Sequence, residues 1–96
     1  MLTAQPLLGA LRFKAGQMVR QLGSPRHEEL RQLLVERREQ AKISQAELGR
    51  RLRWSQRTIS KIETGEKRVT VVELVEIAEA LGFDPLAAVR RVMKRR

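Results

Sequence analysis

The sequence predicts an all-α protein, because signals for the start and the end of short helices recur along it. Side chains that can accept a free backbone N–H precede each expected helix; they are Ser24, Ser44, Ser55, Thr70 and Asp84. Gly65 and Gly82 stand where helices are expected to end, a position at which glycine is favoured. Apolar residues recur three and four positions apart between these signals, as on one face of a helix. The spacing therefore predicts five helices between residues 24 and 93.

The first expected helix begins at Ser24-Pro25 and runs to about Lys42. Proline is favoured in the first turn of a helix, because the N–H that it lacks would have no partner there. Glu28 and Glu29 also fit the first turn, where negative charge is favoured. The expected inward residues are Leu30, Leu33, Leu34, Arg38 and Ala41.

Two further helices are expected near the carboxyl end. Thr70 and Glu73 have the spacing of a capping box, in which each side chain accepts a backbone N–H of the other residue. The valines between 69 and 72 favour a strand, but their run is too short to outweigh this cap. Asp84-Pro85 begins the last helix. The expected inward residues of the first are Leu74, Ile77, Ala78 and Leu81. In the second, Leu86, Val89 and Val92 stand at helical spacing, where they either close the domain or contact a second copy.

The stretch from Ser44 to Gly65 is the most informative part of the sequence. Ser44 and Glu47 have capping-box spacing, and Ser55 can cap a second helix. The expected inward residues are Ala46, Leu48, Leu52, Ile59 and Ile62. Helices this short are not stable alone and need partners elsewhere in the chain. Two short helices joined by a tight turn have the layout of a helix-turn-helix, whose second helix lies in the major groove of DNA.

The second helix of this stretch has a continuous polar arc at about 100° per residue. Its members are Gln56, Arg57, Ser60, Lys61 and Thr64. Glutamine suits adenine, arginine and lysine suit guanine, and serine suits either. A solvated helix face is the alternative interpretation, since such faces are also polar. The caps, the turn and the basic flanks favour DNA contact.

Residues 28–92 resemble the Cro/C1-type, or XRE-type, helix-turn-helix family of regulators through the pattern S-Q-A-E-L…S-Q-x-x-I-S-x-I-E-x-G. The resemblance implies a lambda-repressor-like fold of five helices with double-stranded DNA as the partner. It implies that Gln45 anchors to a phosphate, that the second helix meets base edges and that the following loop touches the backbone. The candidate DNA-binding residues are Gln45, Ser55, Gln56, Arg57, Ser60, Lys61, Thr64, Lys67 and Arg68. It also implies a structural ion pair between Arg38 and Glu63.

The sequence departs from the family pattern at two positions. The turn carries Arg53-Trp54 where the family usually has a glycine, and a non-glycine residue in a left-handed conformation costs about 1–2 kcal/mol. Gly49 stands where the family commonly has alanine, and a close helix contact would explain it. Packing under the turn is the expected role of Trp54, with an indole hydrogen bond to a phosphate as the alternative.

The composition predicts one basic domain with a modest core. The chain has 96 residues, and its 20 lysines and arginines against 11 acids give a net charge of +9. Such an excess favours a nucleic-acid partner. The lack of cysteine excludes disulfides and thiolate metal sites. With neither an apolar spanning run nor a signal peptide in the sequence, we expect a cytoplasmic protein without membrane contact.

No group of residues has the pattern of a catalytic site. His27, the single histidine, is interpreted as a surface residue. Ser44 and Ser55 are already used as caps, and Glu36 and Glu39 lie among arginines and are interpreted as an ion-paired surface. We therefore expect no enzyme activity, no cofactor and no metal site.

The ends of the chain lie outside the strongest pattern. Residues 1–23 form an amino-terminal extension, residues 24–93 the helix-turn-helix domain and residues 94–96 a basic tail. The extension has apolar residues that could line one side of a helix; it is expected to present an interaction surface, to pack on the domain or to order on binding. The tail, with the arginines before it, is expected to be solvated, or to add phosphate contacts.

The sequence thus predicts a sequence-specific regulator of transcription, either a repressor or an autoregulator of its own operon. Two alternatives stay open: an antitoxin that also binds its operator, and a protein-bridging module with the same fold. A homodimer on a two-fold symmetric operator is expected, because one short helix reads too few base pairs. The self-contacts are expected from the amino-terminal segment or from the last helix, through Leu86, Val89, Val92 and Met93.

Overall fold

The computed structural model of the chain describes residues 24–95. The helix expected in residues 1–23 lies outside the described residues, as does Arg96. The described part contains five helices and no strand: α2 (Pro25–Gln40), α3 (Gln45–Leu52), α4 (Gln56–Thr64), α5 (Val71–Leu81) and α6 (Pro85–Lys94). The predicted all-α fold of five helices is therefore confirmed. None of the described helices is long and apolar enough to cross a bilayer.

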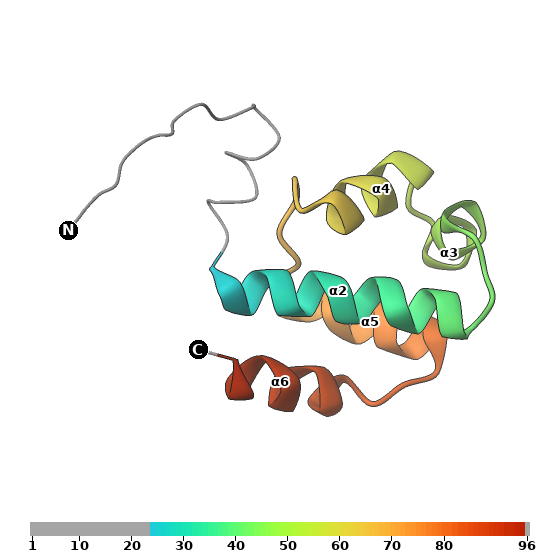
Figure 1. Cartoon of the computed structure of the whole chain (residues 1–96). Coiled ribbons are helices and arrows are strands. Elements are labelled where there is room, and N and C mark those ends of the chain that lie inside the picture. Colours follow the sequence, from blue (N-terminus) through green and yellow to red (C-terminus); the bar gives the residue numbers. More distant parts are fainter. Residues whose placement is uncertain (1–23, 96) are drawn as a thin grey trace, which may run out of the picture.

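The central helix of the fold is α2 (Figure 1). It contacts α4 on one side and α6 on the other, while α3 packs against both α4 and α5. The two helices of the motif, α3 and α4, therefore lie together at one side of the domain, and α6 lies across α2 from α4.

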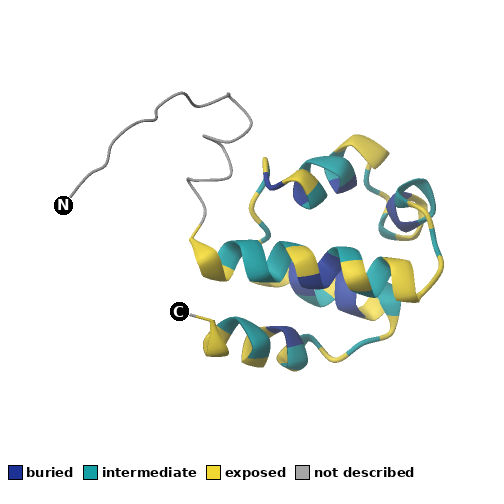
Figure 2. Ribbon diagram, viewed as in Figure 1, coloured by how far each residue is buried: buried dark blue, intermediate teal, exposed yellow. Residues whose placement is uncertain are grey.

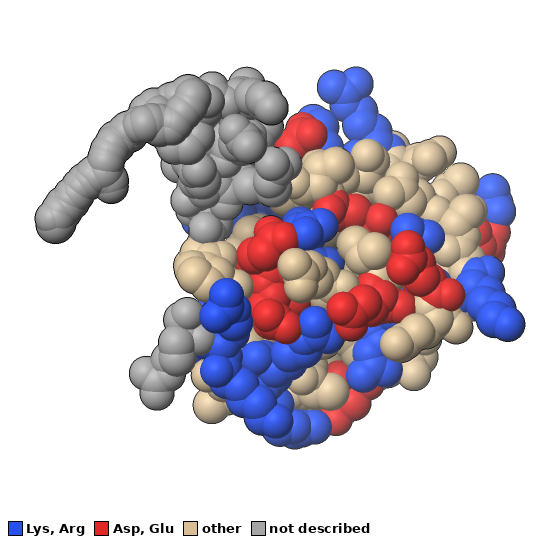
Figure 3. Space-filling view, in the orientation of Figure 1, with Lys and Arg blue, Asp and Glu red and all other residues tan. Residues whose placement is uncertain are grey.

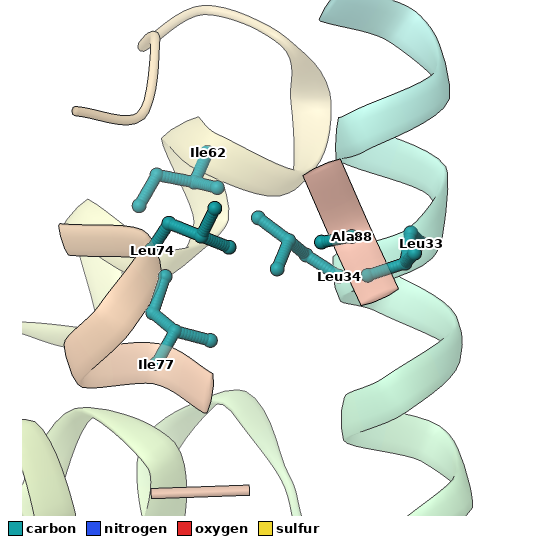
Figure 4. Packing of buried hydrophobic residues seen from close by; sticks show 6 residues of the cluster. All are labelled: Leu33, Leu34, Ile62, Leu74, Ile77 and Ala88. Carbon is teal, nitrogen blue, oxygen red and sulfur yellow. The ribbon is translucent and has the colours of Figure 1, made fainter. Parts of the chain in front are cut away.

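The core lies where α2, α4, α5 and α6 meet, and the dark positions of Figure 2 mark the helix faces that enclose it. Its buried residues, drawn in Figure 4, are Leu33, Leu34, Ile62, Leu74, Ile77 and Ala88. Leu48 and Ile59 are buried as well, as predicted for the inward faces of α3 and α4. Burial of one such leucine or isoleucine contributes about 1.5–3 kcal/mol, so the motif is held by packing rather than by helix propensity.

The predicted helix signals are confirmed in geometry. The cap pairs are Ser24 with the N–H of His27, Ser44 with Glu47, Ser55 with Thr58, Thr70 with Glu73 and Asp84 with Leu86. Gly65 and Gly82 end their helices in the left-handed conformation, with φ of 87° and 78°. Thr70 and Glu73 form the complete capping box that their spacing predicts.

The capping box predicted at Ser44 is wrong in its second half. The hydroxyl of Ser44 accepts the N–H of Glu47 at 3.0 Å, but the carboxylate of Glu47 binds the guanidinium groups of Arg50 and Arg51 instead. Arginines three and four residues further on compete for this carboxylate, and bonds between two charged groups are stronger than a bond to a neutral N–H.

The end of α2 also differs from the prediction. The helix ends at Gln40, and Ala41, expected to face inward, is an exposed cap whose N–H binds the carbonyl of Arg37 at 3.0 Å. Lys42 then takes a left-handed φ of 61° and turns the chain toward α3.

The inward face of α6 is centred on a residue that the apolar pattern did not mark. Ala88 is completely buried, whereas Leu86 and Val89, for which the sequence left a core role and a self-contact open, are 59% and 42% exposed. Val92 is half-buried. A small side chain at position 88 allows α6 to pack closely on α2, and this leaves the larger side chains outside.

Arginines that were expected in a solvated tail instead join α6 to α2. Arg91 binds Glu29 at 2.5 Å and Glu36 at 2.8 Å, and this bridge holds the pKa of Glu36 below its usual range. Glu36 is thus paired across the fold rather than with its neighbours on α2. The guanidinium of Arg26 donates to the carbonyl of Arg95 at 2.7 Å, beyond the last turn of α6.

The turn between α3 and α4 is tight and strained at one residue. Arg53 has a left-handed φ of 60°, as the missing glycine led us to expect. A Cβ on Gly49 would lie 2.7 Å from the carbonyl oxygen of Trp54, so no larger residue fits without a shift of the turn. The close contact that explains Gly49 is therefore with the turn backbone. Trp54 packs against the core cluster, in agreement with its expected packing role.

We expect Arg53→Gly to stabilise the domain by up to about 1 kcal/mol. The relief of the left-handed conformation, about 1–2 kcal/mol, exceeds the entropy cost of glycine, about 0.5–1 kcal/mol. Urea denaturation measures the change. Glu76→Gly, at an exposed position inside α5, is the control and should lose about 1 kcal/mol. Equal destabilisation by both variants would contradict the strain at Arg53.

Candidate nucleic-acid interface

The outward face of α4 is polar, and the core fixes its direction. Ile59 and Ile62 are 2% and 3% exposed and point inward. On the opposite arc, Gln56, Arg57 and Thr64 are exposed, as the helical spacing predicts, whereas Ser60 and Lys61, also expected to be exposed, are half-buried. Ser55 is exposed as well, but its hydroxyl accepts the N–H of Thr58 at 3.1 Å. The five members of the arc thus offer hydrogen-bonding groups from one side of the domain.

A buried ion pair fixes the carboxyl end of α4. The guanidinium of Arg38 on α2 donates to both carboxylate oxygens of Glu63, at 2.6 and 3.0 Å, and to the carbonyl of Ile43 at 2.8 Å. The two charged side chains are only 13% and 10% exposed. The hydrogen bond to Glu63 raises the pKa of Arg38. The ion pair implied by the family resemblance is confirmed.

Arg31 adds a second contact from α2 that the sequence analysis missed. Its guanidinium donates to the carbonyl of Glu63 at 2.6 Å and also pairs with Glu28. Arg31 precedes Arg38 by seven residues, two helical turns, so both lie on the same face of α2. That spacing is the signal that would have found it.

Gln45, the first residue of α3, lies within reach of the same carboxylate. Its amide nitrogen donates to Glu63 at 2.8 Å. A glutamine amide has two N–H groups and a carbonyl oxygen. The bond to Glu63 uses one N–H and does not involve the second N–H or the carbonyl oxygen. The phosphate contact of Gln45 stays a prediction, and the structure adds that α3 and α4 share one acidic anchor.

Hydrogen bonds and an ion pair tie the loop after α4 to the ends of α4 and α5. Thr64 donates to the carbonyl of Lys61 at 3.2 Å. The ammonium of Lys67 lies 3.0 and 2.9 Å from the two carboxylate oxygens of Glu73, the residue that also caps α5. Arg68 is exposed. Lys67, a candidate for DNA contact, is thus already paired within the domain.

The amino end of α2 lies near this loop. Burial and the charge of Arg68 hold the pKa of His27 below its usual range. His27 is half-buried rather than a surface residue, and its Nε2 atom is enclosed without a hydrogen-bond partner in the described part of the chain. Nothing in the periodicity of α2 marked this position.

Two exposed valines follow the loop at the start of α5. Val71 and Val72 are 76% and 66% exposed, although the sequence offered them only as candidates for a short strand. They adjoin the candidate backbone-contacting residues, so the surface next to Arg68 is partly apolar. The described residues contain no cluster of three side chains suited to a metal ion.

Comparison with known proteins assigns the chain to a family. A family model described as helix-turn-helix matches residues 34–86. A solved structure described as "XRE-family like protein from Pseudomonas syringae pv. tomato str. DC3000" is similar at a TM-score of 0.68, with 32% identity over 83% of this chain and 94% of that chain. The chain belongs to the XRE-type helix-turn-helix family. None of the curated proteins matches it significantly. Members of this family are DNA-binding regulators rather than enzymes, and the chain is a regulator in that general sense.

We expect Glu73→Gln to weaken the XRE-type domain in a pH-dependent way. Bonds from the N–H of Thr70 and from Lys67 hold the pKa of Glu73 below its usual value. A depressed pKa stabilises the folded state above the unfolded pKa, about 4.3, and this contribution is lost as the pH falls through the folded value. The variant should lose up to about 1 kcal/mol at neutral pH, and this loss should be smaller at pH 3.

Chemical denaturation at both pH values measures this difference. Glu76→Gln is the matched control, because it removes an exposed carboxylate from the same helix. A loss in Glu73→Gln that stays constant between the two pH values would show that the carboxylate charge has no part in holding the loop.

Proposed function

We propose that the chain is a sequence-specific repressor of transcription that binds double-stranded DNA in the cytoplasm and controls its own operon. The observation that carries this proposal is the outward arc of α4. Gln56 and Arg57 are exposed at its first turn, and the buried pair of Arg38 and Glu63 fixes its last turn. A helix held at its end, with an amide and a guanidinium outside, suits base edges in the major groove.

The candidate residues divide into two roles. Gln56, Arg57, Ser60 and Lys61 lie on the arc that would face the bases. Residues at the rim of the arc would contact the sugar-phosphate backbone and fix the register of the helix; they are Gln45, Ser55, Thr64, Lys67 and Arg68. Lys67 would have to exchange its bond to Glu73 for a phosphate.

A protein-bridging role is less well supported than DNA binding. It would need an apolar outward face on α4, and that face is polar. An antitoxin that represses its own operon would use the same DNA contacts as a simple repressor.

We expect Arg57→Ala and Arg68→Ala to weaken DNA binding in different ways, because Arg57 is assigned to a base contact and Arg68 to a phosphate contact. Loss of a base contact should cost roughly 1–3 kcal/mol on the cognate site and relax its sequence preference. Loss of a phosphate contact should weaken binding to all sequences alike and lower the slope of log affinity against log salt by about 0.9. Selection on random duplexes, followed by anisotropy titrations across salt, measures both effects.

The matched control for these two variants is Arg50→Ala. It removes the same charge from an exposed position on α3 that is not among the candidate DNA residues. Two results would contradict the assignment of α4 as the helix that contacts the bases. One is duplex binding whose affinity does not depend on salt concentration; the other is an Arg57→Ala variant with unchanged affinity and sequence preference.

We also expect two copies to bind an operator with two-fold symmetry. One recognition helix reads only a few base pairs, and two copies on half-sites about 34 Å apart double the information. Footprinting should reveal an inverted repeat, and titration should give two chains per duplex. One chain bound to a single half-site with undiminished specificity would show that pairing is not required.

A further inference from the structure

The outward face of α6 carries an apolar stripe. Leu86, Val89 and Met93 are spaced three and four residues apart, so they lie along one side of the helix. They are 59%, 42% and 63% exposed, and the fully buried Ala88 faces α2 on the other side. Large apolar side chains that lie together in the open usually mark an interaction surface.

A row of cations borders this stripe. Arg90 follows Leu86 by four residues, and Lys94 follows Arg90 by four, so the two lie along the neighbouring side of the helix. The side chain of Arg90 is 61% exposed, and its guanidinium forms an ion pair with the exposed Asp84 at 3.6 Å, a long contact that a carboxylate of a partner can replace. Figure 3 shows basic side chains gathered over α6, next to acidic ones over α2. The face is therefore half apolar and half basic.

Pairing of this face with the same face of a second copy is electrostatically unfavourable. If two α6 helices pack antiparallel about a two-fold axis through the stripe, each residue beside the axis meets its own copy. Arg90 would then lie against Arg90 of the other chain, and like charges across an interface oppose association. A partner surface with carboxylates beside an apolar floor fits better.

The domain contains a surface of that kind at the end of α3. A groove of about 470 Å³ separates the last turn of α3 from α5. Leu52, Trp54 and Ala80 supply apolar surface, while Glu76 and Glu79 are exposed on α5 at its edge.

Arg51 also lines the groove, but its charge is engaged within the domain. Its guanidinium donates to the carboxylate of Glu47 at 3.1 Å and to the carbonyl of Ala80 at 3.3 Å. The two carboxylates of α5 are thus the groups in this groove that an incoming cation would meet.

We propose that α6 of one chain docks into the α3–α5 groove of a second chain. Leu86, Val89 and Met93 would cover the apolar floor, and Arg90 and Lys94 would meet Glu76 and Glu79. The carboxyl end of α6 and the α3–α5 groove lie toward opposite ends of α2 (Figure 1). The contact is therefore head-to-tail. In a row of chains joined in this way, one α6 face stays uncovered at one end and one α3–α5 groove stays empty at the other.

This contact goes beyond the proposed function and does not depend on it. Neither surface includes a candidate DNA-binding residue, so chains could join one another while bound to DNA. The contact area is small, so the association is weak and requires a high chain concentration. On an operator, it would let further copies load next to a bound pair.

The test is a charge exchange followed by sedimentation velocity without DNA. Lys94→Glu and Glu79→Lys each place like charges at the contact, and each alone should weaken self-association about ten-fold. A chain that carries both substitutions should associate again, because its acidic helix then meets the basic groove of the next copy. Met93→Asp should weaken association, because it places a charge against the apolar part of the groove.

The matched control is Glu39→Lys, which makes the same charge change at an exposed position of α2 that does not line the groove. Added to Lys94→Glu in the same chain, it should restore nothing. A parent chain that stays monomeric at high concentration would overturn the proposal, as would single variants that associate like the parent or a double variant that fails to recover. DNA binding by the same proteins, measured separately, shows whether the proposed function stands or fails independently.

Discussion

The position of the candidate interface depends on the carboxylate of Glu63. Two guanidinium nitrogens of Arg38 and the amide of Gln45 all bind it, so the last turn of α4, the first residue of α3 and the last turn of α2 are fixed at one point. Removing one partner leaves an uncompensated charge; because this pair is partly buried, the cost should be below the roughly 3–5 kcal/mol of a fully buried pair, and the pair itself adds little net stability. Its value is therefore orientation: it sets the angle at which the polar arc of α4 leaves the domain.

The fold could be predicted where the signals are local. An amino-terminal cap needs only its own side chain and an N–H three residues on, so Ser55 and Thr70 acted as their types and positions indicated. Gly82 ended α5 through its left-handed backbone, which also depends on that residue alone. The prediction failed where more than one group could bind the same partner. The carboxylate of Glu47 binds Arg50 and Arg51 rather than completing the capping box at Ser44. Family resemblance supplied what local signals do not contain, namely that Arg38 meets Glu63, a residue 25 positions away.

The last helix shows why the remaining structure could not be predicted from the sequence. The apolar pattern of α6 allows either side to face inward, and the choice depends on how closely α2 approaches. Ala88 permits a close approach, and Arg91 then reaches Glu29 and Glu36 on α2. These contacts join residues more than 50 positions apart, so the spacing within α6 carries no information about them. The exposed stripe and its basic border follow from that packing choice.

The recognition helix is fixed at both ends by different kinds of interaction. At its start, the left-handed Arg53 and the backbone contact beneath Gly49 set the turn, and Ser55 caps the first N–H groups. At its end, a buried charge pair holds Glu63. Ile59 and Ile62 then leave no freedom for rotation about the helix axis, because either would have to leave the core. With position and rotation fixed, the side chains on the outward arc can change without a change in the fold, so under the proposed function the DNA sequence that the domain prefers can change there as well.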